Sequence, residues 1–328
     1  MKKSRYIYIV LVMLLIVAGY LVIQNQMGGP GWSSEDFNIE DTADIEFISI
    51  ESVSQNVVLT RDGQTWIVDG QFSAGSEKVR GLLILLSRIK IAGTVQAELY
   101  EEVGNALDLA GKKIIIADSK KVIRSFIVYH DTLYSDNTYM IHENGNAIYR
   151  VEVPGVKYRN LAVLFNTETA FWKSNILFQY RPEEIRHIQC FFPEHPEYSF
   201  QLVNDGITLP KILSYTDGTE TGNINQDLVQ RYLSYYSRVT LAEYLNVSEV
   251  NFLDELRDDE PEVQFRLTDS NNNIIEIDSY TAYYYDNRGG VQVNMNEAFL
   301  WINQSEWARI EYIDLDPIVK QIDYFISD

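Results

Sequence analysis

An uninterrupted apolar run near the N-terminus dominates the hydropathy pattern. Residues 7–23 contain no charged side chain, and Lys2, Lys3 and Arg5 precede them. As a helix with a rise of about 1.5 Å per residue, the run spans roughly 26 Å, close to the hydrocarbon thickness of a membrane. It is longer than the apolar core of a signal peptide, and its end offers only a poor cleavage site. We therefore expect an uncleaved signal anchor at residues 6–24, with a cleaved signal peptide as the alternative.

The basic residues ahead of this run set its direction in the membrane. Because lysine and arginine are retained on the cytoplasmic side, residues 1–5 should form a cytoplasmic tail, with the chain beyond the anchor outside the cytoplasm. Residues 25–43 are polar and contain Pro30 and Gly31, so we expect a linker there. The sequence thus predicts a single-pass protein of the cell membrane, with an extracytoplasmic bulk.

Beyond the linker, one pattern is written twice, in residues 44–153 and 182–328. Each copy begins with a segment of alternating apolar residues and continues to an Asp-Gly pair typical of a tight hairpin, Asp62-Gly63 and Asp205-Gly206. An amphipathic helical stripe follows in each copy. The aligned stripe positions are Val79, Leu82, Leu83, Leu86 and Ile89 in the first copy, and Val229, Tyr232, Leu233, Tyr236 and Val239 in the second. The common order favours an internal duplication over two unrelated domains.

Further strands follow the helix in each copy. Alternation and turn residues predict them at 113–117, 122–128, 138–142 and 147–153, and at 263–268, 274–279, 282–285 and 291–295. Residues 154–181 should connect the copies through a helix and an extended segment, and residues 317–325 should form a last helix. The predicted fold class is α+β: an N-terminal transmembrane helix followed by two tandem units, each a mostly antiparallel sheet with a helix packed on one face.

The charge balance narrows the classes of partner. The chain has 47 acidic and 27 basic residues, a formal net charge of −20. Such a surface repels nucleic acid and anionic lipid headgroups, so we expect no nucleic-acid partner. An apolar fraction of 46% is ample for packed cores. The single cysteine, Cys190, permits no intramolecular disulfide, so each unit depends on its core.

No motif of a catalytic, cofactor or metal site stands out. Gly-x-Ser-x-Gly and glycine-rich phosphate loops are absent, and no two of the four histidines have the helical spacing of metal ligands. His130 and His142 could meet across a hairpin, and the acidic residues 254–262 could hold calcium weakly. Exposed strand residues and a solvated loop are the simpler interpretations. We expect no enzyme and no cofactor, with an unrecognised hydrolase as the alternative.

Aromatic residues gather in the second half of the chain. The candidates for a partner or ligand surface are Tyr280, Tyr283, Tyr284, Tyr285, Trp301 and Trp307. On alternating strands, half of such rings face the core. Any rings that share an exposed face would form a platform for a protein or for sugars.

Several of these segments resemble a known family. They are the N-terminal anchor; Asp62-Gly63-Gln64-Thr65-Trp66 followed by Glu77-Lys78-Val79 and the leucine-rich helix; the strands with Tyr139 and Ile148-Tyr149; and Phe171-Trp172-Lys173-Ser174-Asn175-Ile176-Leu177 leading to Pro182-Glu183-Glu184-Ile185. The arrangement resembles the family called domain of unknown function 4340 over roughly residues 45–202, and departs from it in the tyrosine-rich second half. Members are similar to auxiliary components of ABC export systems of the gliding-motility type. The resemblance implies ATPase and permease subunits as membrane partners, and no catalytic residues.

Two functional hypotheses follow. The first is a membrane-anchored, extracytoplasmic auxiliary or scaffold protein that docks on an ABC-type transport or envelope complex. The alternative is an extracytoplasmic module that binds glycans or peptides through exposed tyrosine and tryptophan side chains.

Overall fold

The computed structural model describes residues 37–133, 135–143, 145–157, 159–246, 253, 256–285, 288 and 290–326. The expected tail, the anchor at residues 6–24 and the first part of the linker lie outside these ranges. Within them, no helix is long and apolar enough to cross a membrane. The described chain is a sheet-rich α+β structure with two large antiparallel sheets and few helices.

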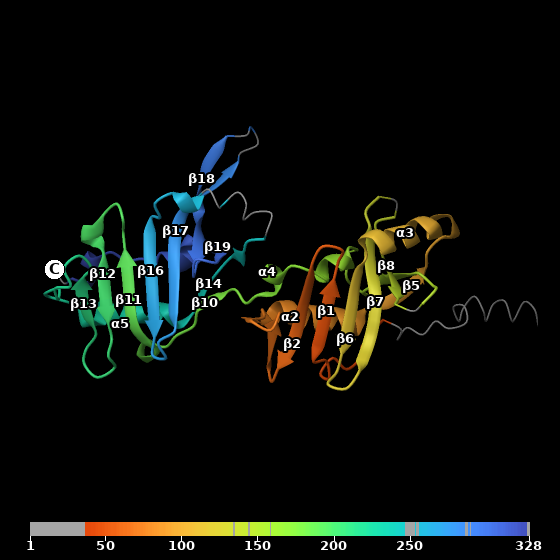
Figure 1. Cartoon of the computed structure of the whole chain (residues 1–328), viewed down its shortest axis with the longest axis horizontal. Coiled ribbons are helices and arrows are strands. Elements are labelled where there is room, and N and C mark those ends of the chain that lie inside the picture. Colours follow the sequence, from red (N-terminus) through yellow and green to blue (C-terminus); the bar gives the residue numbers. More distant parts are fainter. Residues whose placement is uncertain are drawn as a thin grey trace, which may run out of the picture. The chain divides into compact units, whose positions relative to one another are not determined.

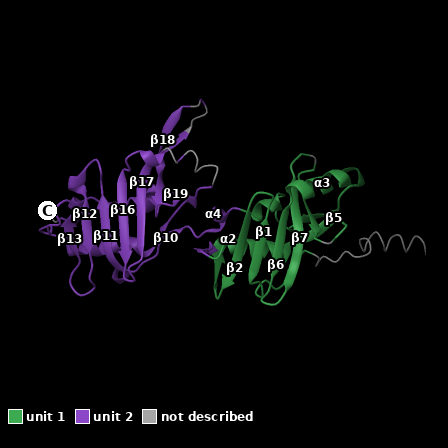
Figure 2. Ribbon diagram, viewed as in Figure 1, with its two compact units in different colours: residues 1–70, 77–167 green, residues 71–76, 168–328 purple. Residues whose placement is uncertain are grey.

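The chain divides into two compact units (Figure 2). Unit 1 comprises the residues up to Gly70 together with Glu77–Thr167, and unit 2 comprises Gln71–Ser76 and Glu168–Asp328. Phe37 and Ile39, which the sequence assigned to the linker, are buried. The segment 71–76 carries the short strand β4 (Phe72–Ser73), so a piece of the earlier chain is part of unit 2.

Unit 1 contains one large sheet (Figure 1). Its strands are β1 (Phe47–Glu51), β2 (Asn56–Asp62), β3 (Thr65–Val68), β5 (Lys90–Thr94), β6 (Lys112–Ala117), β7 (Val122–Asp131), β8 (Asn137–His142) and β9 (Tyr149–Glu152). They lie in the order β3-β2-β1-β6-β7-β8-β9-β5. The helices are α2 (Ser76–Arg88), η1 (Ala97–Leu99), α3 (Tyr100–Ala110) and η2 (Leu161–Leu164).

Unit 2 contains a second large sheet. Its strands are β11 (Ile185–Phe191), β12 (Phe200–Val203), β13 (Lys211–Ser214), β15 (Glu243–Tyr244), β16 (Val263–Asp269), β17 (Ile274–Tyr285), β18 (Val291–Ile302) and β19 (Glu306–Glu311). The order is β13-β12-β11-β16-β17-β18-β19-β15, which repeats the order of unit 1 strand for strand. Strands β10 (Ile176–Phe178) and β14 (Val239–Thr240) pair separately.

Short helices complete unit 2. They are α4 (Thr169–Trp172), η3 (Pro182–Glu184), η4 (Pro196–Tyr198), α5 (Gln226–Ser234), η5 (Tyr235–Ser237), η6 (Leu256–Asp258), α7 (Tyr312–Leu315) and η7 (Ile322–Phe325). The α5 helix begins at Asn225, whose side chain accepts hydrogen bonds from the backbone N–H groups of Asp227 and Leu228. A capped start and a buried stripe explain why this segment is helical.

Both predicted helical stripes face a core. All ten stripe positions are buried except Leu83, which is half-buried. In unit 1, the Ile39 N–H donates to the carbonyl of Leu86 on α2 at 2.9 Å, and Phe37 packs edge-on against Phe126 on β7, with 5.7 Å between ring centroids. This segment therefore joins α2 to one face of the sheet.

Five local predictions were wrong. Helix α3 was not predicted; its Val103 and Leu107, one turn apart, pack against the sheet. Residues 154–181 hold only single helical turns and the short strand β10, and residues 317–325 end in the turn η7. The strands expected at 274–279 and 282–285 are one strand, β17. The loop that contains Asp205 has seven residues, 204–210, and is not a tight hairpin, although Gly206 has a positive φ of 72°, like Gly63 at 60°.

Each sheet also has a small second core on the face away from its main helix. In unit 1, α3 covers a cluster that includes Val103, Leu107 and Tyr139. In unit 2, the corresponding cover comes from the segment with Leu245, Leu253 and Leu256, over Tyr280, Phe299, Trp301 and Trp307. We name this cluster of unit 2 the outer cluster. Aromatic rings that belong to it are shielded from the solvent.

A buried pair of tyrosines links α5 and η5 to the C-terminal segment of unit 2. The Tyr236 hydroxyl donates to the Tyr232 oxygen at 2.7 Å, and the Tyr232 hydroxyl donates to the Ile318 carbonyl at 2.8 Å. Both rings are fully buried, and burial raises the pKa of both hydroxyls. The chain of bonds satisfies two hydroxyls that would otherwise be costly inside the core.

We expect Tyr232→Phe to destabilise unit 2 more than Tyr236→Phe. Removing the Tyr232 hydroxyl deprives both Tyr236 and Ile318 of their main partner, at a cost of about 1–3 kcal/mol, whereas removing the Tyr236 hydroxyl deletes a terminal donor at about 0.5–1.5 kcal/mol. Urea unfolding followed by fluorescence measures both changes, with Tyr198→Phe, at an exposed position, as the control. Equal losses for the two variants would contradict this order.

Candidate binding surface of the second unit

The structure separates the six aromatic residues singled out in the sequence. Tyr280, Trp301 and Trp307 are buried in the outer cluster, and Trp301 retains 9% exposure. Tyr283 and Tyr284 are 43% and 52% exposed, and the side chain of Tyr285 lies outside the described part. Three of the six candidate rings therefore pack in a core, and the two that are seen to be exposed are neighbours on β17.

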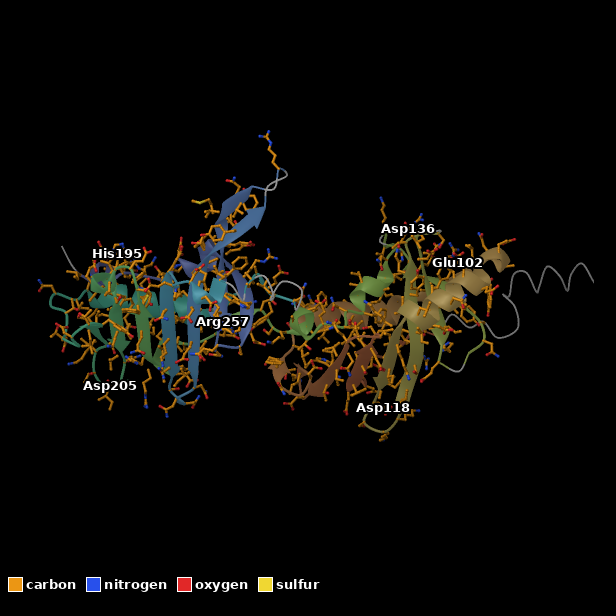
Figure 3. All side chains as sticks on the ribbon, turned by 45° about the horizontal axis from the view of Figure 1, so that its top comes forward. Glu102, Asp118, Asp136, His195, Asp205 and Arg257 are labelled. Carbon is orange, nitrogen blue, oxygen red and sulfur yellow. The ribbon has the colours of Figure 1, made fainter. Side chains whose placement is uncertain are left out.

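The buried rings pack against one another. The rings of Trp301 and Trp307 have centroids 4.9 Å apart, and Tyr280 lies 5.5 Å from Trp307. The guanidinium of Arg257, from η6, lies over the Trp301 ring at 5.6 Å. Figure 3 places Arg257 beside the sheet, well away in that view from His195 and Asp205. Because they contact one another and Arg257, these rings contribute to packing within unit 2.

The outer half of the β17–β18 hairpin is a two-stranded ribbon. Strand β17 is paired with β16 only up to Ser279, and β18 is paired with β19 only from Glu297 onward. Beyond these points, among the residues that the structure describes, β17 and β18 pair only with each other and project from the sheet (Figure 1). A two-stranded hairpin without further packing is marginally stable in water, so this ribbon lacks the support that the other strands have.

Apolar side chains line this ribbon. Tyr283 pairs with Val293, and Tyr285 pairs with Val291, so the two valines lie on the same face as Tyr283. Val291, Val293 and Met295 are exposed, Met295 at 80%. We name Tyr283, Tyr284, Val291, Val293 and Met295 the apolar ribbon. Clustered exposure of this kind is typical of an interaction site, whereas single exposed apolar residues are not informative.

A bulge sets the ribbon apart from the rest of the sheet. Thr281 pairs with Ala298, but Tyr283 pairs with Val293, so residues 294–297 of β18 lie opposite Ala282 alone. The Asn294 side-chain amide donates to Glu297 at 2.9 Å, and its oxygen accepts from the Asn296 N–H at 3.0 Å. Bulges bend a strand and redirect its side chains. The bulge marks the point where the strand leaves the sheet.

The residues considered for metal binding do not converge. His130 pairs with Thr138, and His142 pairs with Phe126, so the two histidines lie at opposite ends of the β7–β8 ladder. The described residues contain no group of three His, Cys, Asp or Glu side chains that could hold a metal ion. Of the acidic run at 254–262, Asp254 and Glu255 lie outside the described part.

Cys190 and His187 lie on opposite faces of β11, as the alternation predicts. Cys190 belongs to the main core, where burial raises the pKa of its thiol. His187 is half-buried on the outer face, and this burial lowers the pKa of its imidazole, against the opposing effect of its hydrogen bond with Gln201. The two side chains therefore cannot act as a nucleophile and base.

Lys173 is a buried cation of unit 2. Its ammonium group pairs with Glu306 and lies 3.8 Å from the ring centroid of Phe72 and 4.2 Å from that of Tyr244. Burial, together with Glu306, raises the pKa of Tyr244 to about 12. The backbone N–H of Ser174 also donates to the carbonyl of Ser73 at 2.8 Å. No local sequence pattern indicates this site, which holds the segment 71–76 within unit 2.

Comparison with known proteins gives no match: no protein-family model and no curated protein is similar to this chain.

The lowered pKa of His187 predicts a pH dependence of stability. Between the folded pKa and the ordinary value of 6.5, the unfolded chain binds a proton that the folded chain does not, so stability falls as the pH decreases through this window. Urea unfolding at pH 8 and pH 5 should therefore show a smaller loss for His187→Gln than for the unsubstituted protein. An equal loss in the two proteins would disprove the assignment.

Proposed function

We propose that this chain is a membrane-anchored, extracytoplasmic scaffold protein without catalytic activity, which docks on a partner protein through the apolar ribbon. The observation that carries the proposal is the exposure of Tyr283, Val291 and Val293 on one face of an unsupported hairpin. Such a face gains apolar burial and packing support when a partner covers it.

The location and the kind of partner rest on the sequence. The apolar run at residues 7–23 and the basic residues before it support a single-pass anchor with the bulk outside the cytoplasm. The resemblance to domain of unknown function 4340 supports an ABC-type transport or envelope complex as the partner. We further propose that the two units arose by duplication, because the strand order is the same in both.

The alternative, a glycan- or peptide-binding module built on exposed tyrosine and tryptophan rings, is less well supported in that form. Three of its six rings lie in the outer cluster. The two exposed tyrosines, Tyr283 and Tyr284, belong to the apolar ribbon. Its valines and methionine complement an apolar protein surface better than they complement a polar ligand.

The proposal is tested by photo-crosslinking in cells. With p-benzoylphenylalanine in place of Tyr283, we expect one adduct with a protein that also co-purifies with the unsubstituted chain. Val291→Thr, Val293→Thr and Met295→Gln together should abolish the adduct. They should change the free energy of unfolding by less than about 0.5 kcal/mol, because these side chains are exposed.

The control places the crosslinker at Tyr100, an exposed tyrosine of unit 1. If positions 100 and 283 yield the same adducts, or if the triple variant retains its adduct, the ribbon is not a docking surface.

A further inference from the structure

A polar groove lies on the outer face of the unit 2 sheet, next to the outer cluster. It consists of two adjoining cavities of about 210 Å³ and 410 Å³ that share Gln264, Asp278, Trp301 and Gln304. Together they fall within the range of roughly 300–1,000 Å³ typical of small-ligand sites. The apolar ribbon is not part of their lining.

The floor of the groove is a row of side chains across four strands. Phe191 on β11 pairs with Gln264 on β16, Gln264 pairs with Asp278 on β17, and Asp278 pairs with Trp301 on β18. With about 4.8 Å between strands, the row from Phe191 to Trp301 is roughly 14 Å long. Both ends of the row are therefore aromatic, and the middle is polar.

The charged groups of the groove lining are two arginines, Arg257 and Arg266, and three carboxylates, Asp259, Glu276 and Asp278. Arg266 and Glu276 form a pair with 3.3 Å between nitrogen and oxygen, and Gln189 lies beside them on β11. Burial and then Glu276 raise the pKa of Asp278, while a hydrogen bond from Gln264 lowers it. The lining thus offers amide donors and acceptors with both signs of charge, an arrangement that favours neither an anion nor a strong cation.

One end of the groove presents an aromatic surface. Phe191 and Tyr215 stack with 4.8 Å between centroids and 28° between planes, and both are half-buried at the rim. At the other end, Arg257 lies over Trp301. A ring face at the rim suits a ligand with one apolar side and several hydroxyl groups.

Gln304 occupies a strained backbone position at the groove. The turn between β18 and β19 has Asn303 and Gln304 as its central residues, with φ of 49° and 53°, and is closed by the Ser305 N–H donating to the Ile302 carbonyl at 3.0 Å. Such a turn strongly prefers glycine at its second central position. Glutamine there has a conformational cost, and its side chain lines both cavities.

We propose that this groove binds a neutral saccharide, and that Gln304 is a ligand-contacting residue whose strained position serves this binding. The groove lies over the central strands β11, β16, β17 and β18, whose backbone groups are already paired, so an extended peptide cannot add as a strand there. Recognition must come from side chains: amides and the carboxylate of Asp278 for hydroxyl groups, and the Phe191–Tyr215 stack for a sugar ring.

The test separates binding from stability at one residue. The full-length protein in detergent is titrated with maltotriose, cellotriose and N,N′-diacetylchitobiose, with sialyllactose and tetra-alanine as charged and peptide comparators. We expect binding of at least one neutral saccharide. Gln304→Gly should weaken its Kd by about tenfold or more, as expected for a lost hydrogen-bonding group, while raising the urea midpoint because the strain is relieved.

Matched variants make the test selective. Gln304→Ala should weaken binding similarly without the gain in stability, and Asp278→Asn should also weaken it. Gln292→Ala, on the ribbon, should leave binding unchanged. Binding of none of the three neutral saccharides, binding of tetra-alanine or sialyllactose alone, or an unchanged Kd in both Gln304 variants would overturn the proposal. The ribbon variants test docking separately, since they leave the groove intact.

Discussion

A β-sheet has two faces, and one helix can bury only one of them. Each unit meets this constraint in the same way on its main face, where a helical stripe packs onto the sheet. The units differ on the other face. In unit 1, α3 supplies a second cover, whereas in unit 2 the described apolar residues of the cover, Leu245, Leu253 and Leu256, pack near β17, β18 and β19. The open remainder of that face is where the polar groove lies.

Unit 2 also retains two features that cost stability locally. The apolar ribbon extends two strands beyond the support of their neighbours, and Gln304 occupies a position that glycine would fill with less strain. Neither feature belongs to the main core. Features that oppose folding yet are held in place by the surrounding structure are the usual marks of surfaces that bind.

The buried ionisable groups of unit 2 serve packing. Lys173 is surrounded by Phe72, Tyr244 and Glu306, and the Cys190 thiol lies inside the main core. The carboxylate of Asp269 accepts two backbone N–H groups, from Asn271 and Asn273. These groups already have local partners, so they stabilise the fold of unit 2.

The sequence by itself determined most of the strands, the two helical stripes and the repeated order along the chain, because alternation and the 3.6-residue period record which side chains face a core. It did not indicate β5 or β19, and it divided β17 into two strands. The sequence analysis missed α3, because only two of its residues, Val103 and Leu107, are buried and their pattern is too short to indicate a helix without the sheet against which they pack. Only the tertiary structure decided which aromatics are exposed. Tyr280 and Tyr283 belong to the same strand, β17. Tyr280 is buried under the outer cluster, whereas Tyr283 lies beyond the bulge and is exposed. The groove could not be predicted from the sequence either. Its row of side chains from Phe191 to Trp301 depends on the pairing of strands that are distant in the chain, which no local pattern encodes.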